Sequence, residues 1–242
     1  MRIAFDLDGV LADLHGVFAK TAIRMFPALD LSAVGAPEVG ASPPDTEEFP
    51  TEAPPTPSTP MASLPLTGSQ SAAVWHELSS TTNFWETLSE IEPGMIKRLA
   101  ALTEERRWEL LFITSRPRAK GRTVQRQSQR WLQEMGFPMP STYVVHGSRG
   151  QIAKALHIDV VVDDRPENCL DVVLESEAGA ILVWRGNRAS VPASARRMGI
   201  AVVPTVAACL EALTQIERPE DSQGLLDRLR SLFGLRTTRT TS

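Results

Sequence analysis

Cysteines are scarce in this sequence, with only Cys169 and Cys209 among 242 residues. Each lies within a predicted helix, so a disulfide framework is not expected and a reducing compartment is the default. No apolar run approaches the length needed to cross a bilayer, and the N-terminus passes straight into a predicted strand without a signal-peptide pattern. We therefore expect a cytoplasmic protein with no membrane partner.

Lysine and arginine are absent between Met25 and Ile96, a stretch that contains ten acidic residues. The whole chain has 25 basic and 29 acidic residues, so its formal net charge of -4 conceals a basic remainder. An acidic segment repels a nucleic-acid backbone, and a nucleic-acid polymer is therefore not an expected partner. Any anionic substrate would be attracted by the basic remainder.

Proline is concentrated in one segment, residues 36–66, which contains nine of the chain's 18 prolines. The remaining residues there are mostly small or polar, so the segment cannot bury enough apolar surface to offset its ordering cost, and we predict a disordered loop. Amphipathic patterns predict helices on both sides of it, at 13–26, 71–78 and 83–88. We therefore predict a small helical insertion over residues 13–91.

The rest of the chain alternates between strand and helix patterns. Apolar strands are predicted at 2–6, 108–113, 142–145, 158–162, 180–184 and 200–203, with helices between them. Continuous apolar strands separated by helices are typical of a mostly parallel sheet covered on both faces. The predicted fold class is α/β, with a core formed by residues 1–12 and 92–216. Residues 217–242 are expected to form an amphipathic helix and a flexible tail.

Three predicted strands end in polar residues, which is where open α/β sheets bind their ligands. These residues are Asp6 and Asp8, Thr114 and Ser115, and Asp163 and Asp164. Asp6 and Asp8 lie on the same side of a period-2 backbone, so their carboxylates repel each other unless a cation or a proton intervenes. The alternative interpretation is an ordinary Asx-type turn closing a strand.

These clusters supply what phosphoryl transfer through an aspartyl-phosphate needs: a carboxylate nucleophile, a second carboxylate for proton transfer and a hard-cation site. Asp6, the Asp8 carbonyl and one of Asp163 or Asp164 would suffice for Mg2+. The Thr114 hydroxyl can bind a phosphoryl oxygen. Lys154, nine residues before Asp163, could offset the charge of the transition state.

The order of these motifs resembles the haloacid dehalogenase-like (HAD) phosphohydrolase superfamily over residues 1–12 and 92–185. The resemblance implies a Rossmann-like three-layer α/β/α core with a small helical cap inserted after the first motif. It also implies that Asp6 attacks phosphorus and that Asp8 protonates the leaving oxygen and then activates water. The remaining implied roles are phosphate binding by Thr114, Ser115 and Lys154, and Mg2+ binding by Asp6, Asp8 (carbonyl) and Asp164 with support from Asp163.

Several segments look like the 5'(3')-deoxyribonucleotidase branch of that superfamily. They are Asn83-Phe84-Trp85-Glu86-Thr87-Leu88, Glu92-Pro93-Gly94, Phe112-Ile113-Thr114-Ser115 and Trp131-Leu132. Members of that branch sandwich a pyrimidine base between cap aromatics, a role for which Phe84 and Trp85 are the candidates. Their alternative role is to anchor the cap helices on the core. The sequence departs from the branch in its long Pro-rich insert.

Arg116 follows the predicted phosphate-binding strand end and has two possible roles: it could reach a substrate phosphate or base, or pair with Asp163, Asp164 or Glu167. The predicted function is a Mg2+-dependent phosphomonoesterase acting on a small substrate, with a nucleoside monophosphate as one candidate. The alternatives are a phosphatase of a non-nucleotide ester and a non-catalytic scaffold that docks partners through its Pro-rich insert and C-terminal helix.

Overall fold

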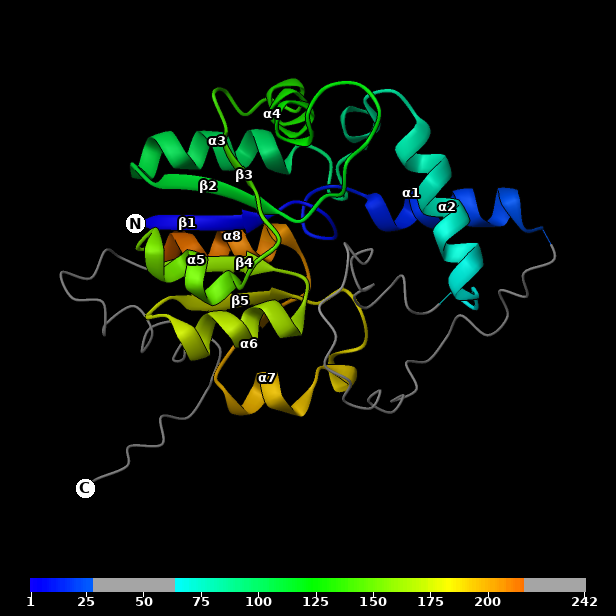
Figure 1. Cartoon of the computed structure of the whole chain (residues 1–242). Coiled ribbons are helices and arrows are strands. Elements are labelled where there is room, and N and C mark those ends of the chain that lie inside the picture. The colour runs from blue at the N-terminus through cyan, green and yellow to red at the C-terminus, as the bar shows by residue number, and fades with distance from the viewer. Residues whose placement is uncertain (28–63, 216–242) are drawn as a thin grey trace.

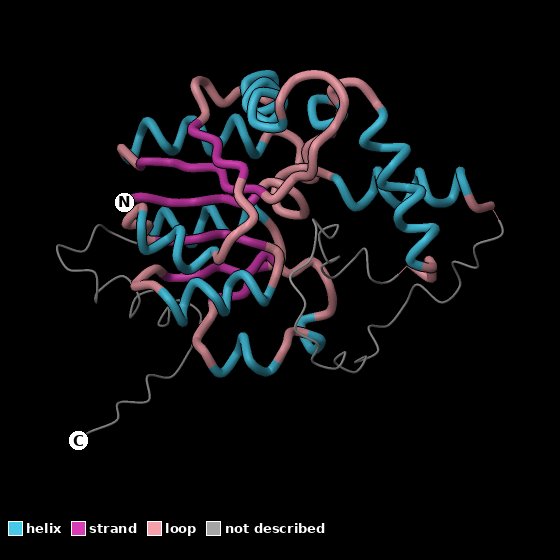
Figure 2. The backbone as a smooth tube through the Cα atoms, viewed as in Figure 1, coloured by secondary structure: helices cyan, strands magenta, loops and turns pink. Residues whose placement is uncertain are grey.

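Six parallel strands form a single sheet in the computed structural model, which describes residues 1–27 and 64–215. The strands are β1 (Arg2–Asp6), β2 (Glu109–Thr114), β3 (Ser141–Val144), β4 (Val160–Asp163), β5 (Gly179–Val183) and β6 (Ala201–Val203). Their order across the sheet is β3-β2-β1-β4-β5-β6. Figure 2 shows the strands side by side with helices on both sides. The predicted α/β class with a parallel sheet is confirmed.

The first strand, β1, lies in the middle of the sheet and pairs with both β2 and β4. Ala4 is in register with Leu111 on one side and with Val161 on the other. The strand order reverses direction at β1, which is the position where such sheets leave a crevice for ligands. The polar ends of β1, β2 and β4 therefore meet at one edge.

Helices cover both faces of the sheet. One face carries α3 (Met95–Arg106), α4 (Val124–Glu134) and α8 (Val206–Gln215), and the other carries α5 (Arg149–Ala155), α6 (Pro166–Glu175) and α7 (Ala193–Arg197). Alternate residues of β1 divide between the two cores, because successive strand side chains point to opposite faces. Ile3 and Phe5 pack with the first group, and Ala4 packs with the second. The predicted three-layer arrangement is confirmed.

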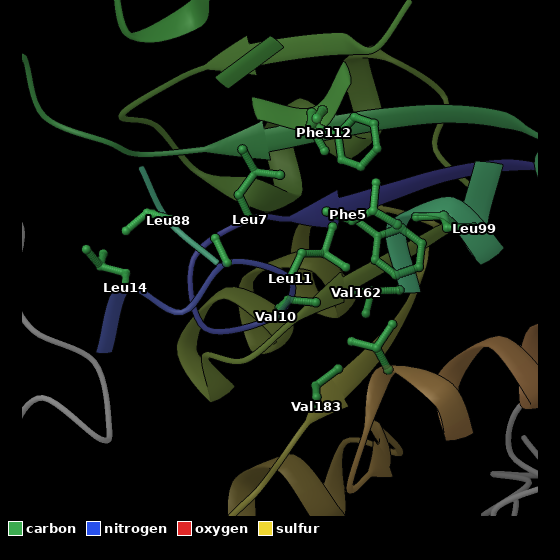
Figure 3. Packing of buried hydrophobic residues seen from close by; sticks show 14 of the residues in the cluster. Phe5, Leu7, Val10, Leu11, Leu14, Leu88, Leu99, Phe112, Val162 and Val183 are labelled. Carbon is green, nitrogen blue, oxygen red and sulfur yellow. The ribbon is translucent and has the colours of Figure 1, made fainter. Parts of the chain in front are cut away.

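The segment after β1 forms α1 (Leu14–Met25), and α2 (Gly68–Ser80) and a 3-10 turn, η3 (Phe84–Glu86), precede α3. Both α1 and α2 lie beyond the carboxyl end of β1 (Figure 1). The Asp13 carboxylate caps α1 by accepting from the Gly16 N–H at 2.9 Å. Apolar residues of the connections, Leu11 and Leu88 among them, join the main core, and Figure 3 shows Leu11 beside Phe5.

Some predicted elements differ from the structure. The expected helix at 83–88 is only the turn η3, and α7 and the turn η4 (Arg188–Ser190) were not predicted. Most of the Pro-rich segment and all of residues 217–242 lie outside the described residues. Within the described ranges, no helix is both long and apolar enough to span a bilayer.

Candidate active site

Asp6 and Asp8 lie at the carboxyl end of β1, where a tight turn carries the chain toward α1. Asp6 ends the strand and is buried, whereas the Asp8 side chain is 15% exposed. Gly9 has a φ of +85°, and a Cβ atom there would come within 2.0 Å of Asp164 Oδ2. Only glycine tolerates both the backbone conformation and this approach. The turn therefore brings the Asp164 carboxylate against the backbone that follows Asp8.

The two aspartates at the end of β4 have different surroundings. Asp163 is fully buried, and its carboxylate accepts hydrogen bonds from the Arg165 N–H at 2.8 Å and from Asn168 Nδ2 at 2.9 Å. The Asp164 carboxylate instead lies beside Gly9. Asp163 is thus held by its own loop and helix, while Asp164 faces the turn after β1.

Burial and neighbouring carboxylates raise the pKa values of Asp6 and Asp164. Burial, followed by the negative charge of Asp163, raises the pKa of Asp6 well above its ordinary value, although Arg149 acts in the opposite direction. Burial and then Asp163 also raise the pKa of Asp164 well above its ordinary value. A cation bound among these groups would relieve the repulsion.

The chemistry of these donors fits Mg2+, which prefers oxygen ligands and usually takes one or two carboxylates. In residues 1–27 and 64–215, no three His, Cys, Asp or Glu side chains are arranged as a ready metal cluster. The predicted site needs fewer side chains than that, since it uses the carboxylates of Asp6 and Asp164 and the Asp8 carbonyl. Gly9, by admitting Asp164 against this backbone, is the feature of the structure that favours the set.

Arg149, at the start of α5, is the basic residue that contacts Asp6. Its Nη2 donates to Asp6 Oδ1 at 3.1 Å and to Ser115 Oγ at 3.0 Å, and its Nε lies 3.8 Å from Asp163 Oδ2. The side chain is buried, and Nη1 has no hydrogen-bond partner among the described residues. A buried donor without a partner is costly, and it marks a place where a ligand atom can bind.

Lys154, the predicted phosphate-binding cation, is exposed in the last turn of α5. A helix that follows a parallel strand begins at the carboxyl edge of the sheet and runs away from it. The five residues from Arg149 to Lys154 correspond to about 7.5 Å along the axis and about 140° around it. The structure therefore does not bring Lys154 to the other site residues, whereas it places Arg149 beside Asp6.

Gly150 lets the start of α5 approach α6 closely enough to set the position of Arg149. A Cβ atom at Gly150 would lie 2.3 Å from the Asp171 carbonyl oxygen. The Gly150 N–H donates to Asp171 Oδ2 at 3.1 Å, and the Ser148 hydroxyl caps the helix by accepting from Gln151 N–H at 3.0 Å. The pattern Ser-Arg-Gly at the start of a helix after β3 is the sequence signal that could have identified Arg149.

Arg116 pairs with Asp8, which corrects both roles considered for it. Its Nε and Nη2 lie 2.9 and 2.8 Å from the two oxygens of Asp8, and the Thr114 hydroxyl adds a hydrogen bond to Asp8 at 3.2 Å. The Arg116 side chain has no exposed surface. A fully enclosed guanidinium cannot touch a substrate, and its nearest carboxylate is that of Asp8 rather than those of the β4 end.

Phe84 and Trp85 are only 3% and 1% exposed and belong to the main core. Their rings pack edge to face with centroids 4.9 Å apart, and Trp85 Nε1 donates to the Pro117 carbonyl at 3.1 Å. Rings enclosed in this way have no free face on which a base could stack. The structure thus gives these residues the alternative role, as anchors between the inserted segment and the core.

Two further residues at this edge were not predicted. His15, in the first turn of α1, lies beside Gly9, and burial lowers its pKa although Asp8 and Asp13 act in the opposite direction. Arg185 follows β5, contacts the Gly9 carbonyl and donates to the Val10 carbonyl at 3.0 Å. The contacts of Arg185 join distant segments, so no local pattern reveals them.

No protein-family model and no curated protein matches the sequence. Among solved structures, a putative β-phosphoglucomutase from Thermotoga maritima is 17% identical, with a TM-score of 0.51 over 89% of this chain and 99% of that chain. A haloacid dehalogenase-like family hydrolase from Streptococcus pneumoniae is 11% identical, with a TM-score of 0.49 over 88% and 97%. A hydrolase from Pseudomonas syringae is 15% identical, with a TM-score of 0.48 over 90% and 100%.

The similarity to the Thermotoga maritima protein, which has the highest TM-score of the three, confirms the predicted Rossmann-like α/β fold. At this level of identity it concerns the fold alone. The assignment to the deoxyribonucleotidase branch stays a prediction.

Proposed function

We propose that the chain is a phosphomonoester hydrolase that forms an aspartyl-phosphate on Asp6. The observation that carries the proposal is the buried and unpartnered Nη1 of Arg149, whose neighbouring Nη2 is bonded to Asp6 within the described structure. A guanidinium presents parallel donors that match the oxygens of a phosphoryl group. A phosphate ester bound here would satisfy Nη1 and place phosphorus beside the Asp6 carboxylate.

The proposed reaction has two steps that share one proton carrier. An oxygen of Asp6 bonds to phosphorus while the bond from phosphorus to the ester oxygen breaks, and Asp8 gives the leaving oxygen the proton that it took from water in the preceding turnover. Water then attacks the phosphorus of the aspartyl-phosphate, Asp8 takes a proton from it, and inorganic phosphate leaves with Asp6 restored. The partial exposure of Asp8 supports this role, because proton transfer needs access to the leaving group and to water.

Ser115 completes the proposed phosphate-binding site at the end of β2. Ser115 Oγ accepts from Arg149, which leaves its own hydroxyl proton free to donate to a phosphoryl oxygen. Thr114 is buried and bonded to Asp8, so it links the site's proton carrier to the same strand end. Lys154 is replaced in the proposal by Arg149.

Mg2+ is the proposed cofactor, held by Asp6, the Asp8 carbonyl and Asp164, with Asp163 as the supporting residue. The hydrogen bonds that Asp163 accepts from Arg165 and Asn168 support this division. When bound, the ion supplies positive charge that offsets the charge of the phosphoryl oxygens. Burial and neighbouring carboxylates raise the pKa values of Asp6 and Asp164, and a cation bound between the two groups would lower them again.

The proposed substrate is a small phosphate monoester. A nucleoside monophosphate is a candidate through sequence resemblance, but the burial of Phe84 and Trp85 removes the feature that favoured a base. A panel of deoxynucleoside monophosphates, sugar phosphates and phosphoglycolate separates the possibilities. A preference for nucleotides would require a base-binding surface other than these two rings.

The proposal is tested by hydrolysis of p-nitrophenyl phosphate with Mg2+. We expect activity in the unaltered chain, loss of it in Asp6→Asn, and loss of it after EDTA treatment with recovery on adding Mg2+. Lys154→Ala is the matched control, because it removes a basic residue from the helix that carries Arg149 and should leave the rate unchanged. Equal rates in the unaltered chain and Asp6→Asn would rule out the aspartyl-phosphate route.

A further inference from the structure

We infer that Arg116 is a positioning residue that fixes the orientation of the Asp8 carboxylate for proton transfer. The inference rests on the proposed function, in which Asp8 protonates the leaving oxygen. It concerns a residue that has no contact with the substrate and acts only through its partner.

The geometry of the pair restricts the Asp8 side chain. Arg116 donates through Nε and Nη2 to both carboxylate oxygens, at 2.9 and 2.8 Å, so the planes of the two groups are held together. Arg116 has no exposed surface, whereas Asp8 is 15% exposed. The arginine therefore holds the carboxylate from within the protein and leaves its outer side accessible.

The guanidinium itself sits in a site built from separate segments of the chain. Its carbon lies 4.8 Å from the ring centroid of Trp85 and 5.5 Å from that of Trp131, and Nη1 donates to Ser128 Oγ at 2.9 Å. The tryptophan N–H groups are also engaged, with the carbonyls of Pro117 and Leu88. Every guanidinium nitrogen thus has a partner, and the aromatic faces favour its charge.

The groups around the Arg116 side chain explain why arginine is suited to this position. A buried guanidinium needs a carboxylate partner, and Asp8 is the acidic partner that the described residues provide. Lysine would keep the charge but would lose the two parallel hydrogen bonds and the stacking on two indole rings. A purely structural role, in which Arg116 only fills the space between the tryptophans, is the competing explanation.

The two explanations differ in how the leaving group affects the loss of activity. A p-nitrophenolate departs readily without a proton, whereas a phenolate, with a conjugate-acid pKa of about 10 like that of tyrosine, benefits from a general acid. A misplaced Asp8 should therefore slow the hydrolysis of phenyl phosphate more than that of p-nitrophenyl phosphate. The two esters have nearly the same shape, so a loss of fold or of substrate binding would affect both equally.

The experiment compares Arg116→Lys with the unaltered chain on both esters. We expect kcat to fall about 100-fold for phenyl phosphate and about 10-fold for p-nitrophenyl phosphate, with KM changed less than about threefold. Arg118→Ala is the matched control, because this exposed arginine lies on the same loop and has no side-chain partner in the described structure. It should leave both rates unchanged.

Two further variants keep the test decisive. In the Asp8→Asn background, Arg116→Lys should cause no additional selective loss, because the proton carrier is already gone. Ser128→Ala keeps the arginine but removes one of its hydrogen bonds, and it should give a smaller loss with the same preference for phenyl phosphate. This variant serves if Arg116→Lys does not fold, which its melting temperature would reveal.

The outcomes separate the inference from the proposed function. Equal losses on the two esters, or no loss in Arg116→Lys, would overturn the positioning role while leaving the phosphatase proposal intact. An unaltered chain that hydrolyses neither ester would instead refute the proposed function, and the inference with it.

Discussion

Two buried arginines reach the two aspartates of the first motif, and they differ in how completely their hydrogen bonds are satisfied. Arg116 has a partner for each guanidinium nitrogen and lies between two indole rings. Arg149 contacts Asp6 and Ser115, but within the described ranges its Nη1 has no partner. The guanidinium of Arg116 is therefore fully hydrogen-bonded, whereas that of Arg149 keeps one donor without a partner.

This difference separates groups that build the active site from groups that receive a ligand. Each buried polar atom needs a partner, so the unpartnered Nη1 beside Asp6, the proposed nucleophile, marks where we propose that a substrate oxygen binds. A second contrast concerns charge, because Asp8 is paired with Arg116, whereas burial and the negative charge of Asp163 raise the pKa values of Asp6 and Asp164. Replacing Asp8 should therefore destabilise the protein, whereas replacing Asp164 by asparagine should stabilise it at high pH.

The largest expected effect is that of Arg149→Ala on catalysis. Removing the donor proposed for the phosphoryl group should lower kcat/KM for p-nitrophenyl phosphate about 1,000-fold, or about 4 kcal/mol. Inhibition by inorganic phosphate should weaken in parallel, and Arg149→Lys should recover part of the activity. Normal activity and normal phosphate inhibition in Arg149→Ala would show that this arginine serves only the fold.

The next effect concerns the contribution of the Arg116–Asp8 ion pair to stability. Asp8→Asn leaves the enclosed Arg116 without a charged partner, and it should lower the free energy of unfolding by about 3 kcal/mol in urea titrations at pH 7. The Asn168→Ala variant, which removes a neutral partner of Asp163, is the comparison and should cost about 1 kcal/mol. If Asp8→Asn were as stable as the unaltered chain, Arg116 would have to be satisfied by groups other than Asp8.

A smaller effect, which increases stability, is expected on replacing Asp164. The pKa of Asp164 is raised on folding, chiefly by burial, so its contribution to stability is present at low pH and is lost as the pH rises through the raised pKa. Without metal, Asp164→Asn should therefore raise the melting temperature by a few degrees at pH 8, and by less at pH 5. Stabilisation by Mg2+ should also shrink in this variant. A lower melting temperature of Asp164→Asn at pH 8 would contradict a raised pKa of Asp164.

The sequence was sufficient to predict the strand ends that carry most of the candidate site residues. Apolar runs followed directly by polar residues mark where parallel strands end, which is why Asp6, Thr114 and Asp163 were expected at one edge and are found there. The order of the motifs also predicted the class of fold. These inferences needed only local patterns and the general geometry of parallel sheets.

The contacts of Arg116 could not be predicted in this way. Arg149 differs, because the start of the helix after β3 was an available signal, but Lys154 was chosen for its chemistry instead. The burial of Arg116 depends on Trp85 and Trp131, which come from segments 31 and 15 residues away in the chain. A side chain enclosed by distant segments leaves no signal in its neighbouring sequence.

A third arginine extends the comparison to the rim of the site, where Arg185 joins the turn after Asp8 to Glu92 at 2.8 Å. Glu92 also accepts the N–H groups of Val206 and Ala207, at 2.7 and 3.0 Å, and so caps α8. Burial raises the pKa of Glu92, but these hydrogen bonds and Arg185 together outweigh it and lower the pKa overall.

The smallest predicted effect is that of Glu92→Gln, because this side chain is partly exposed and solvent screens its charge. We expect the free energy of unfolding to fall by about 1 kcal/mol at pH 7, a loss typical of a helix N-cap.

The effect of Glu92→Gln should also depend on pH. A lowered carboxyl pKa stabilises the fold above the unfolded pKa, and this contribution disappears as the pH falls through the folded pKa. The difference between the variant and the unaltered chain in urea titrations should therefore shrink toward pH 3. An equal loss at both pH values in Glu92→Gln would assign its role to packing rather than charge.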